Sequence, residues 1–436
     1  MARAAGDCAL LDYLGHLGAD RPGYVEGALM AQAKRKVRAD ESQALIVDSW
    51  LCWSAISLAA LGLVMIASAS LAIAENAGLH PLYYAFKHSV ALTLGCLMGA
   101  VCLKIPLRNL EKASALLMLL IFPLLMLVFV PGFGVTVNGA TRWVRTGLLN
   151  FQVVEAVKIL LAIYLAGYAV RHAQAIRSRF IGSFKPLVVA CLIATLLLAQ
   201  PDFGGAVLVM GMTGAVIWQA GARLRDLAAL ALLTLPPAIW LAFSEGYRVS
   251  RLKSFMDPWA DPFNNGFQLT QALIAVGRGE WLGVGLGGSV QKLFYLPEAH
   301  TDFILAVLAE ELGLFGLVGM MTLFGLLVGR GLLIAMQALQ QGQYFAGYLA
   351  YGLSFLLGLQ AIVNIGVNLG VLPTKGLTLP LISSGGSSAM MTCVVIALLL
   401  RVAHEVHRQA ELPQAKGSDR KKRAKAEPAR SKRARA

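Results

Sequence analysis

The feature that most constrains this chain of 436 residues is a series of long apolar runs that recurs along most of its length. Each run holds about 20 residues, which is enough for a helix to cross the hydrocarbon core of a bilayer. The runs are continuous rather than alternately apolar and polar, so helices are favoured over the strands of a barrel. The sequence therefore predicts an all-α polytopic membrane protein with about ten transmembrane helices. The expected spans are 49–74, 83–103, 113–131, 153–170, 186–200, 204–221, 226–243, 303–329, 345–369 and 378–401.

The distribution of lysine and arginine predicts how these helices are oriented. Basic residues are concentrated before the first span, in alternate connections such as 104–112 and 171–185, and in the C-terminal tail. Because basic loops stay in the cytoplasm, both termini are expected to be cytoplasmic. The long connection between the seventh and eighth spans, residues 244–302, is then extracytoplasmic. It is far longer than ordinary connections, which predicts a functional role.

The chain divides by composition into a cytoplasmic N-terminal extension, 1–44, a transmembrane domain, 45–405, and a basic cytoplasmic tail, 406–436. The extension lacks the pattern of a signal peptide, and Met30 is an alternative start of translation. The tail supplies much of the net charge of +14, and its low-complexity composition predicts disorder. Anionic lipid is its simplest partner. No nucleic acid is expected, although the tail by itself leaves nucleic acid or a cytosolic protein open.

Two outward segments carry turn and helix signals. Within residues 132–150, the dipeptide Asn-Gly at 138–139 predicts a tight hairpin that presents Arg142. Within the long connection, residues 266–279 have the amphipathic pattern of a helix. The glycine-rich stretch that follows fits either a tight turn or a close approach of the backbone to a substrate, and both interpretations stay open.

Ionisable side chains at the level of the membrane gather toward the outer leaflet in this topology. Such residues are costly in a bilayer and are functional candidates for that reason. Each also has a simpler role: Glu155 and Lys158 have the spacing of an ion pair on one helix face, and Asp202 has the position of a helix cap. The set comprises Lys87, His88, Glu155, Lys158, Asp202, Asp302 and Lys375.

The stretch YLPEAHTDFI, residues 295–304, places Glu298, His300 and Asp302 directly before the eighth span. Thr301 and Asp302 could cap that helix, and the helix dipole would keep the carboxylate charged. Partial burial would instead raise its pKa toward a value useful for proton abstraction, and the sequence does not decide between the two effects. Carboxylates, cations and amides at the outer leaflet suit a lipid-linked sugar with an anionic phosphate head.

Four blocks of sequence resemble, in the same order, the SEDS family of FtsW, RodA and SpoVE, and most closely its FtsW branch. They are VNGATRW at 137–143, QPDFG at 200–204, GFQLTQALIAVGRGEWLGVGLGGSVQKLFYLPEAHTDFILAVLAEELGLFG at 266–316, and NIGVNLGVLPTKGLTLPLISSGGSS at 364–388. The resemblance covers roughly residues 45–405. It implies a peptidoglycan glycosyltransferase of the bacterial inner membrane that polymerises lipid II at the outer face of that membrane and is concentrated at the division septum. The implied partners are lipid II, a class B penicillin-binding transpeptidase similar to FtsI, and other membrane proteins of the divisome.

The resemblance also implies roles for particular residues. Asp302 matches the family's catalytic aspartate and would be the general base of an inverting transfer with undecaprenyl pyrophosphate as leaving group. A divalent cation, Mg or Mn, could bridge the pyrophosphate to a carboxylate, but no ligand set identifies a metal site. No other cofactor is implied. The residues expected in the substrate cleft are Arg142, Glu155, Lys158, Asp202, Arg248, Lys292, Glu298, His300, Lys375 and Ser387.

Three positions depart from the family pattern, and two other functions stay open. Val153, Gly205 and Ser384 stand where the family usually has proline, threonine and tyrosine.

A lipid II flippase is the first alternative to a glycosyltransferase, and it would need a polar track through both leaflets. A non-catalytic scaffold for the septal transpeptidase is the second. The shared blocks also leave an elongation or sporulation role open beside division.

Overall fold

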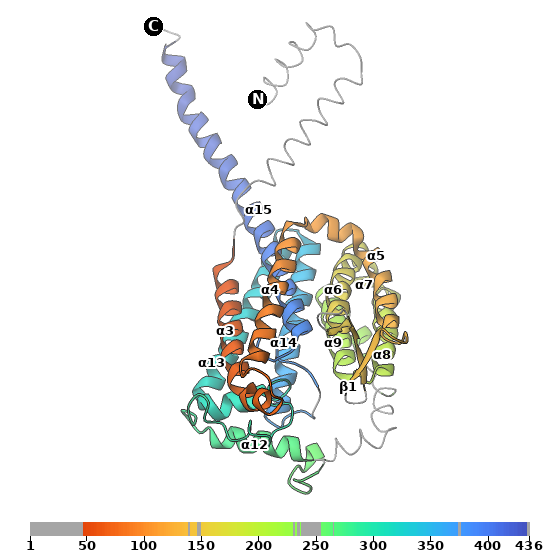
Figure 1. The fold of residues 1–436 in the computed structure, drawn as a ribbon. Helices are drawn as coiled ribbons and strands as arrows, with labels where there is room; N and C mark the ends of the chain where they lie inside the picture. Colours follow the sequence, from red (N-terminus) through yellow and green to blue (C-terminus); the bar gives the residue numbers. More distant parts are fainter. Residues whose placement is uncertain are drawn as a thin grey trace. The chain divides into compact units, whose positions relative to one another are not determined.

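The computed structural model describes residues 47–433 except 138–139, 146–149, 230–231, 233–235, 237–253, 265 and 374–375, with side chains described through residue 409. Helices dominate the described residues, and Figure 1 shows their arrangement. The elements are α3 (Ser49–Asn76), α4 (Tyr83–Lys104), α5 (Leu107–Leu127), β1 (Gly134–Val137), β2 (Ala140–Arg145), β3 (Asn150–Gln152), α6 (Val153–Arg171), α7 (Ala173–Ser178), α8 (Phe180–Ala199), α9 (Phe203–Gln219), α12 (Phe267–Arg278), α13 (Ile304–Gln340), α14 (Tyr344–Asn368) and α15 (Gly386–Arg433).

The structure confirms a polytopic helical membrane protein. Within the described residues, eight helices are long and apolar enough to cross a bilayer: α3, α4, α5, α6, α8, α13, α14 and the part of α15 from Gly386 to Gln409. The apolar helix α9 has 17 residues and matches the expected sixth span. The expected seventh span, 226–243, lies largely outside the described residues. The amphipathic helix predicted at 266–279 is confirmed as α12.

Helix α14 is the centre of the helical packing, because it contacts α6, α9, α13 and α15 (Figure 1).

Small residues on α4 let this helix approach α15 closely. A Cβ on Gly95 would lie 2.8 Å from the Met390 Cα, and one on Gly99 would lie 3.0 Å from the Ala397 Cβ. Within membranes such close approach is a main source of helix association, since lipid offers no hydrophobic driving force.

A small antiparallel sheet, β1-β2-β3, follows α5. Its first two strands confirm the predicted hairpin, with Val135 opposite Trp143, and β3 is an addition that the sequence analysis did not predict. The expected disorder of the basic tail stays a prediction, because the side chains of residues 410–433 lie outside the described part of α15.

The last expected span was placed too early, at 378. Residues 376–385 form turns, bends and irregular backbone, and α15 begins only at Gly386. The side chains of Leu379, Leu381 and Ile382 are at most 2% exposed. They are apolar because they pack inside the protein, and a hydropathy pattern cannot distinguish that burial from contact with lipid.

Helix α13 is interrupted at Gly313, where φ is 65° and ψ is −162°. The amides of Leu314 and Phe315 donate to the carbonyls of Glu280 and Trp281, at 2.9 and 3.2 Å. The connection between α12 and α13 therefore supplies hydrogen bonds that the interruption removes from the helix.

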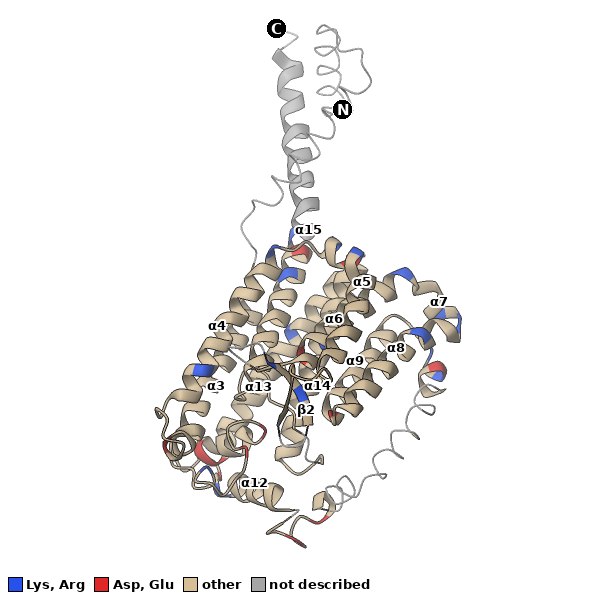
Figure 2. Ribbon diagram, turned by 45° about the vertical axis from the view of Figure 1, so that its right-hand side comes forward, with Lys and Arg blue, Asp and Glu red and all other residues tan. Residues whose placement is uncertain are grey.

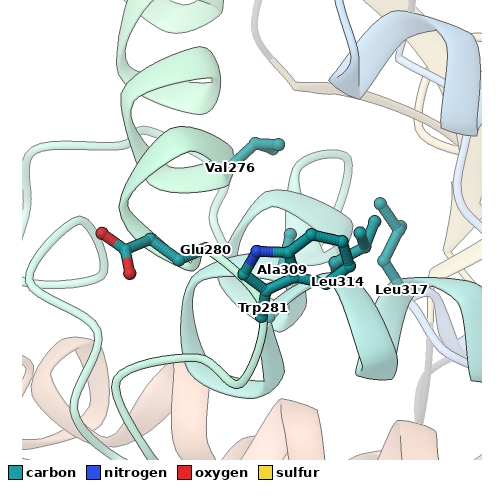
Figure 3. A pocket seen from close by; sticks show the side chains of 7 residues that line it. Val276, Glu280, Trp281, Ala309, Leu314 and Leu317 are labelled. Carbon is teal, nitrogen blue, oxygen red and sulfur yellow. The ribbon is translucent and has the colours of Figure 1, made fainter.

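The glycine-rich stretch after α12 packs against this interruption. Gly283 and Gly285 have φ of 79° and 94°, and a Cβ on Gly283 would lie 2.2 Å from the Glu311 carbonyl oxygen. These contacts favour the tight-turn interpretation of that stretch. A hollow beside it is drawn in Figure 3, with the Trp281 indole next to Leu314, and it shares no residue with the site around Asp302.

At the other end of α13, Arg330 joins it to the start of α3. The Arg330 Nη2 lies 2.7 Å from the Asp48 Oδ2, and Asp48 caps α3 by accepting from the Leu51 amide at 3.1 Å. Burial acts to raise the pKa of Asp48, but the hydrogen bonds from Arg330 and Leu51 and the charge of Arg330 outweigh it and leave this pKa below its ordinary value.

We expect Asp48→Asn to destabilise the folded protein by roughly 1–2 kcal/mol, because it weakens a largely buried ion pair and leaves Arg330 uncompensated. The depressed pKa means that the wild-type contribution is present above the ordinary pKa of aspartate and is lost as the pH falls through the folded value. Melting curves in detergent at neutral and acidic pH measure this difference. If the difference in melting temperature between wild type and Asp48→Asn is the same at both pH values, the ion pair does not make this contribution to stability.

Candidate active site

Asp302 lies in a tight turn that leads into α13. Glu298 has a φ of 57°, and its carbonyl accepts from the amides of Thr301 and Phe303 at 3.1 and 3.2 Å. The Thr301 hydroxyl donates to the Glu298 carboxylate at 2.7 Å. Phe303 occupies the N-cap position of α13, and it has no side-chain cap. Glu298 and Thr301 therefore shape the turn. The Thr301 hydroxyl bonds to Glu298 rather than to an amide of α13, and the capping role of Asp302 stays a prediction.

Gly376 lies next to both the Asp302 carboxylate and the Arg142 guanidinium. A Cβ on Gly376 would lie 3.2 Å from the Asp302 Oδ2 and 3.9 Å from the Arg142 Nη1. A carboxylate and a guanidinium thus lie within 4 Å of one point, which Gly376 leaves open by lacking a side chain. Residues from β2, from the start of α13 and from the segment before α15 meet here, although they are far apart in sequence.

Arg142 is held in place by the turn between α8 and α9. Its Nε donates to the Gln200 carbonyl at 3.3 Å, and its Nη2 donates to the Pro201 carbonyl. Its Nη1 lies 4.0 Å from the Asp202 Oδ1. The main-chain contacts leave Nη1 as the nitrogen nearest to the open space beside Gly376.

Asp202 confirms the predicted capping role, because its Oδ1 accepts from the Gly205 amide at 3.0 Å and so caps α9. The departure at Gly205 fits this cap. A Cβ there would lie 2.7 Å from the Asp202 Oδ2 and 3.0 Å from the Val154 Cγ2, so a side chain would displace the carboxylate or its neighbour.

Glu155 and Lys158 form the predicted ion pair on α6, with 2.9 Å between the Glu155 Oε1 and the Lys158 Nζ, and both are buried. Lys158 also donates to the Gln360 Oε1 on α14 at 2.8 Å. The Gln360 amide in turn donates to the Thr378 carbonyl at 2.9 Å. The pair is therefore connected to the segment that carries Gly376. Figure 2 shows how few charged residues the helical bundle holds between its two ends.

Three buried amides on α14 were missed by the sequence analysis. Gln360, Asn364 and Asn368 follow one another at intervals of four residues, which places them on one helix face. A row of amides at this spacing inside an apolar helix is a signal that the sequence contains. Their hydrogen bonds reach the backbone of Asp302 and of residues 377–378.

Other predicted cleft residues are engaged elsewhere. Lys292 is buried, and its Nζ lies 2.8 Å from the Glu311 Oε1 and 2.9 Å from the Ser68 hydroxyl. The Ser387 hydroxyl donates to the Asn150 carbonyl and accepts from the amide of Gln152. These contacts anchor a loop and a strand, and a substrate-binding role for Lys292 and Ser387 stays a prediction. Arg248 and Lys375 lie outside the described residues.

His300 packs its ring on Tyr84, with 5.0 Å between the ring centroids, and its carbonyl accepts from the Ser384 amide. Burial lowers the pKa of His300, and the charge of Glu298 opposes this effect without reversing it. Burial therefore favours the neutral imidazole. His300 joins the turn before α13 to the segment that precedes α15.

The described residues contain no group of three or more His, Cys, Asp and Glu side chains that could hold a metal. Asp202 also lies beside the Arg142 guanidinium, whose charge disfavours a cation at that carboxylate. A divalent cation near Asp302 would take many of its ligands from phosphate and water, as Mg²⁺ commonly does. The predicted Mg or Mn stays a prediction.

The family model of FtsW, RodA and SpoVE, described as cell cycle proteins, matches residues 49–408. The chain belongs to that family. The family resemblance drawn from the four sequence blocks is thereby confirmed.

Relatives in this family are similar to the chain over most of its length. A protein of Xanthomonas oryzae named probable peptidoglycan glycosyltransferase FtsW is 46% identical over 412 residues, which cover 94% of this chain and 84% of that protein. A protein of Hahella chejuensis with the same name is 49% identical over 364 residues, 84% of this chain and 92% of the relative.

Two solved structures share the fold. A chain from a peptidoglycan synthase complex that coordinates polymerization and crosslinking has a TM-score of 0.68 and 31% identity, over 83% of this chain and 99% of that chain. The rod shape determining protein RodA of Thermus thermophilus has a TM-score of 0.59 and 29% identity, over 82% and 97%. The fold therefore places this chain among polytopic membrane proteins of the family.

Gly376→Ala tests whether the open space beside Asp302 is needed. The φ of Gly376 lies outside the left-handed region, so the backbone accepts alanine, and the new methyl would lie in the space itself. We expect glycosyltransferase activity to fall roughly 10- to 100-fold with the fold intact. Gly277→Ala is the matched control, because a Cβ there meets nothing within 4 Å. Equal activity of the two variants would mean that the space is not used.

Proposed function

We propose that this protein is a peptidoglycan glycosyltransferase of the FtsW type, which polymerises lipid II into β-1,4-linked glycan at the outer face of the bacterial inner membrane during cell division. The observation that carries this proposal is the convergence of Asp302, Arg142 and the open position at Gly376. The names of the relatives and the membership of the family support the class of reaction.

In the proposed reaction, the Asp302 carboxylate takes the proton from the 4-hydroxyl of the acceptor N-acetylglucosamine. That oxygen forms a bond to the anomeric carbon of the donor N-acetylmuramic acid, while the bond from this carbon to undecaprenyl pyrophosphate breaks. An α-linked donor then gives a β-linked product, so one base suffices and no covalent sugar–enzyme intermediate is needed. The Arg142 Nη1, which would lie 3.9 Å from a Cβ on Gly376, would offset the negative charge that develops on the pyrophosphate.

Partners and placement form part of the same proposal. A class B penicillin-binding transpeptidase similar to FtsI is the expected partner, supported by the solved relative from a synthase complex that joins polymerization to crosslinking. Septal location and contacts with other divisome proteins follow from the resemblance, and cytoplasmic termini follow from the distribution of lysine and arginine. Lys375 and Arg248 are further proposed ligands of lipid II.

The deciding experiment supplies lipid II to the purified protein in complex with its transpeptidase partner and looks for glycan polymer. Polymer made by wild type supports the proposal. Transfer of lipid II across vesicle membranes without polymer would favour the flippase. A protein that does neither, yet activates the transpeptidase, would be the scaffold.

A further inference from the structure

The main-chain carbonyl of Asp302 is held by two side chains of α14. The Asn364 Nδ2 donates to this carbonyl at 3.1 Å, and the Asn368 Nδ2 donates to it at 3.0 Å. The two asparagines are 1% and 0% exposed. Hydrogen bonds buried to this degree are costly to leave unmade, so the two amides fix the peptide that follows the Asp302 side chain.

Asn368 also replaces a helix cap for α13. Its Oδ1 accepts from the Ala306 amide at 3.2 Å, while its Nδ2 donates to the Asp302 carbonyl. In a continued helix these two main-chain groups, four residues apart, would pair with each other. The Asn368 carboxamide bridges them, and the Ala306 amide also donates to the Phe303 carbonyl at 3.0 Å. Phe303, at the N-cap position, supplies no side-chain bond of its own.

Asn364 connects the segment that contains Gly376 to the Asp302 carbonyl. Its Nδ2 donates to the Leu377 carbonyl as well as to that of Asp302. Leu377 directly follows Gly376, so a single amide sets the distance between the Asp302 peptide and the segment that bounds the space. Asn368 supports Asn364 by donating to its carbonyl at 3.0 Å.

The chemistry explains why amides occupy these positions. An aspartate at 368 could accept from Ala306, but it would repel the Asp302 carbonyl and carboxylate. A leucine would remove one donor to the Asp302 carbonyl, which would keep Asn364, and one acceptor of the Ala306 amide, which would keep the Phe303 carbonyl. The carboxamide donates and accepts while remaining neutral, which lets it lie close to a carboxylate without adding charge.

We propose that Asn364 and Asn368 are positioning residues for the catalytic step: they orient Asp302 toward the open space beside Gly376 and contact no substrate themselves. This inference rests on the proposed function, in which Asp302 is the base. Without the two amides, the Asp302 side chain is held less firmly in its position. A misplacement of a catalytic group by about 1 Å can lower the reaction rate about 10²-fold.

The test compares the double variant Asn364→Ala/Asn368→Ala with wild type and with Ser354→Ala, in complex with the transpeptidase partner and lipid II. Ser354 is a matched control, since it is a fully buried polar residue of the same helix whose hydroxyl has no hydrogen-bond partner within the described structure. We expect kcat of the double variant to fall roughly 10- to 100-fold while KM for lipid II stays within about threefold of wild type. The melting temperature in detergent should lie below that of Ser354→Ala, because the double variant loses buried hydrogen bonds, and kcat is therefore expressed per mole of folded protein.

Three results would overturn the inference: an unchanged kcat, a loss confined to KM, or a loss no larger than the loss of folded protein. If the double variant does not fold, the single variants Asn364→Ala and Asn368→Ala carry the same comparison, because each leaves the other amide donating to the Asp302 carbonyl. A fully active Asp302→Asn would instead remove the base assignment of the proposed function. A silent Asp302→Asn beside a fully active double variant would remove only the positioning role.

Discussion

Asp302→Asn is expected to lower the rate of lipid II polymerisation by roughly 10²- to 10⁴-fold, the range that a positioned general base contributes. The amide has nearly the shape of the carboxylate but cannot accept the proton of the acceptor hydroxyl. The loss should therefore appear in kcat, while the affinity for lipid II and the melting temperature stay close to those of wild type. Polymer formation from labelled lipid II, measured on the complex with the transpeptidase, gives both kcat and KM.

The matched control is Asp257→Asn, because Asp257 is a carboxylate of the connection between α9 and α13 that accepts from the Ala260 amide at 3.2 Å in an exposed turn. An asparagine can make the same bond, so this variant should polymerise as wild type does. If both variants are equally active, Asp302 is not the base. If both fail equally, the connection as a whole is required, and a specific role for Asp302 is not supported.

Arg142→Ala is expected to lower kcat/KM by roughly 10²- to 10³-fold, the loss typical of removing one preorganised donor from a developing negative charge. The guanidinium reaches the Gln200 and Pro201 carbonyls and still presents Nη1 to the space beside Gly376. Arg142→Lys should recover little of the loss, because one ammonium cannot hold two carbonyls and also reach a substrate phosphate. The measurement is the same polymerisation assay with varied lipid II.

Arg145→Ala is the control for Arg142. Arg145 is an exposed residue of the same strand, three positions further along, so its side chain points to the other face of the sheet. Both variants remove one positive charge and one long side chain. A similar loss in both would point to the net charge of the sheet, whereas a loss confined to Arg142→Ala supports its place in the site.

The sequence predicted the spans better than their ends. Hydropathy identified α3, α4, α6 and α14 within a few residues, because a long apolar run in a bilayer satisfies its own backbone polar groups only as a helix. It failed at residues 376–385, where apolar side chains are buried against other parts of the protein. It could not show the interruption at Gly313, since the residues on both sides are equally apolar and only the packed connection from α12 makes the interruption stable.

Some contacts of the ionisable and amide side chains could be predicted from the sequence, and others could not. The spacing of Glu155 and Lys158 was sufficient to predict their pairing, because neighbours on a helix face are fixed by local geometry. Nothing local predicts that Lys292 pairs with Glu311, or that Asn368 bonds to Ala306, which lies 62 residues away along the chain. These contacts depend on which helices pack together, and a single sequence does not state that packing.

By itself, the sequence determined that the chain spans a membrane many times, that its family is that of FtsW, RodA and SpoVE, and that Asp302 is the residue to test first. Those conclusions need only residue types and their order, because a bilayer requires long apolar runs and a family shares ordered blocks. The tertiary structure decided which residues surround Asp302: Arg142 and Gly376 at the open space, and Asn364 and Asn368 behind it. Their convergence is a property of helix packing, since α14 brings its buried amides to the start of α13 and no local pattern specifies that meeting.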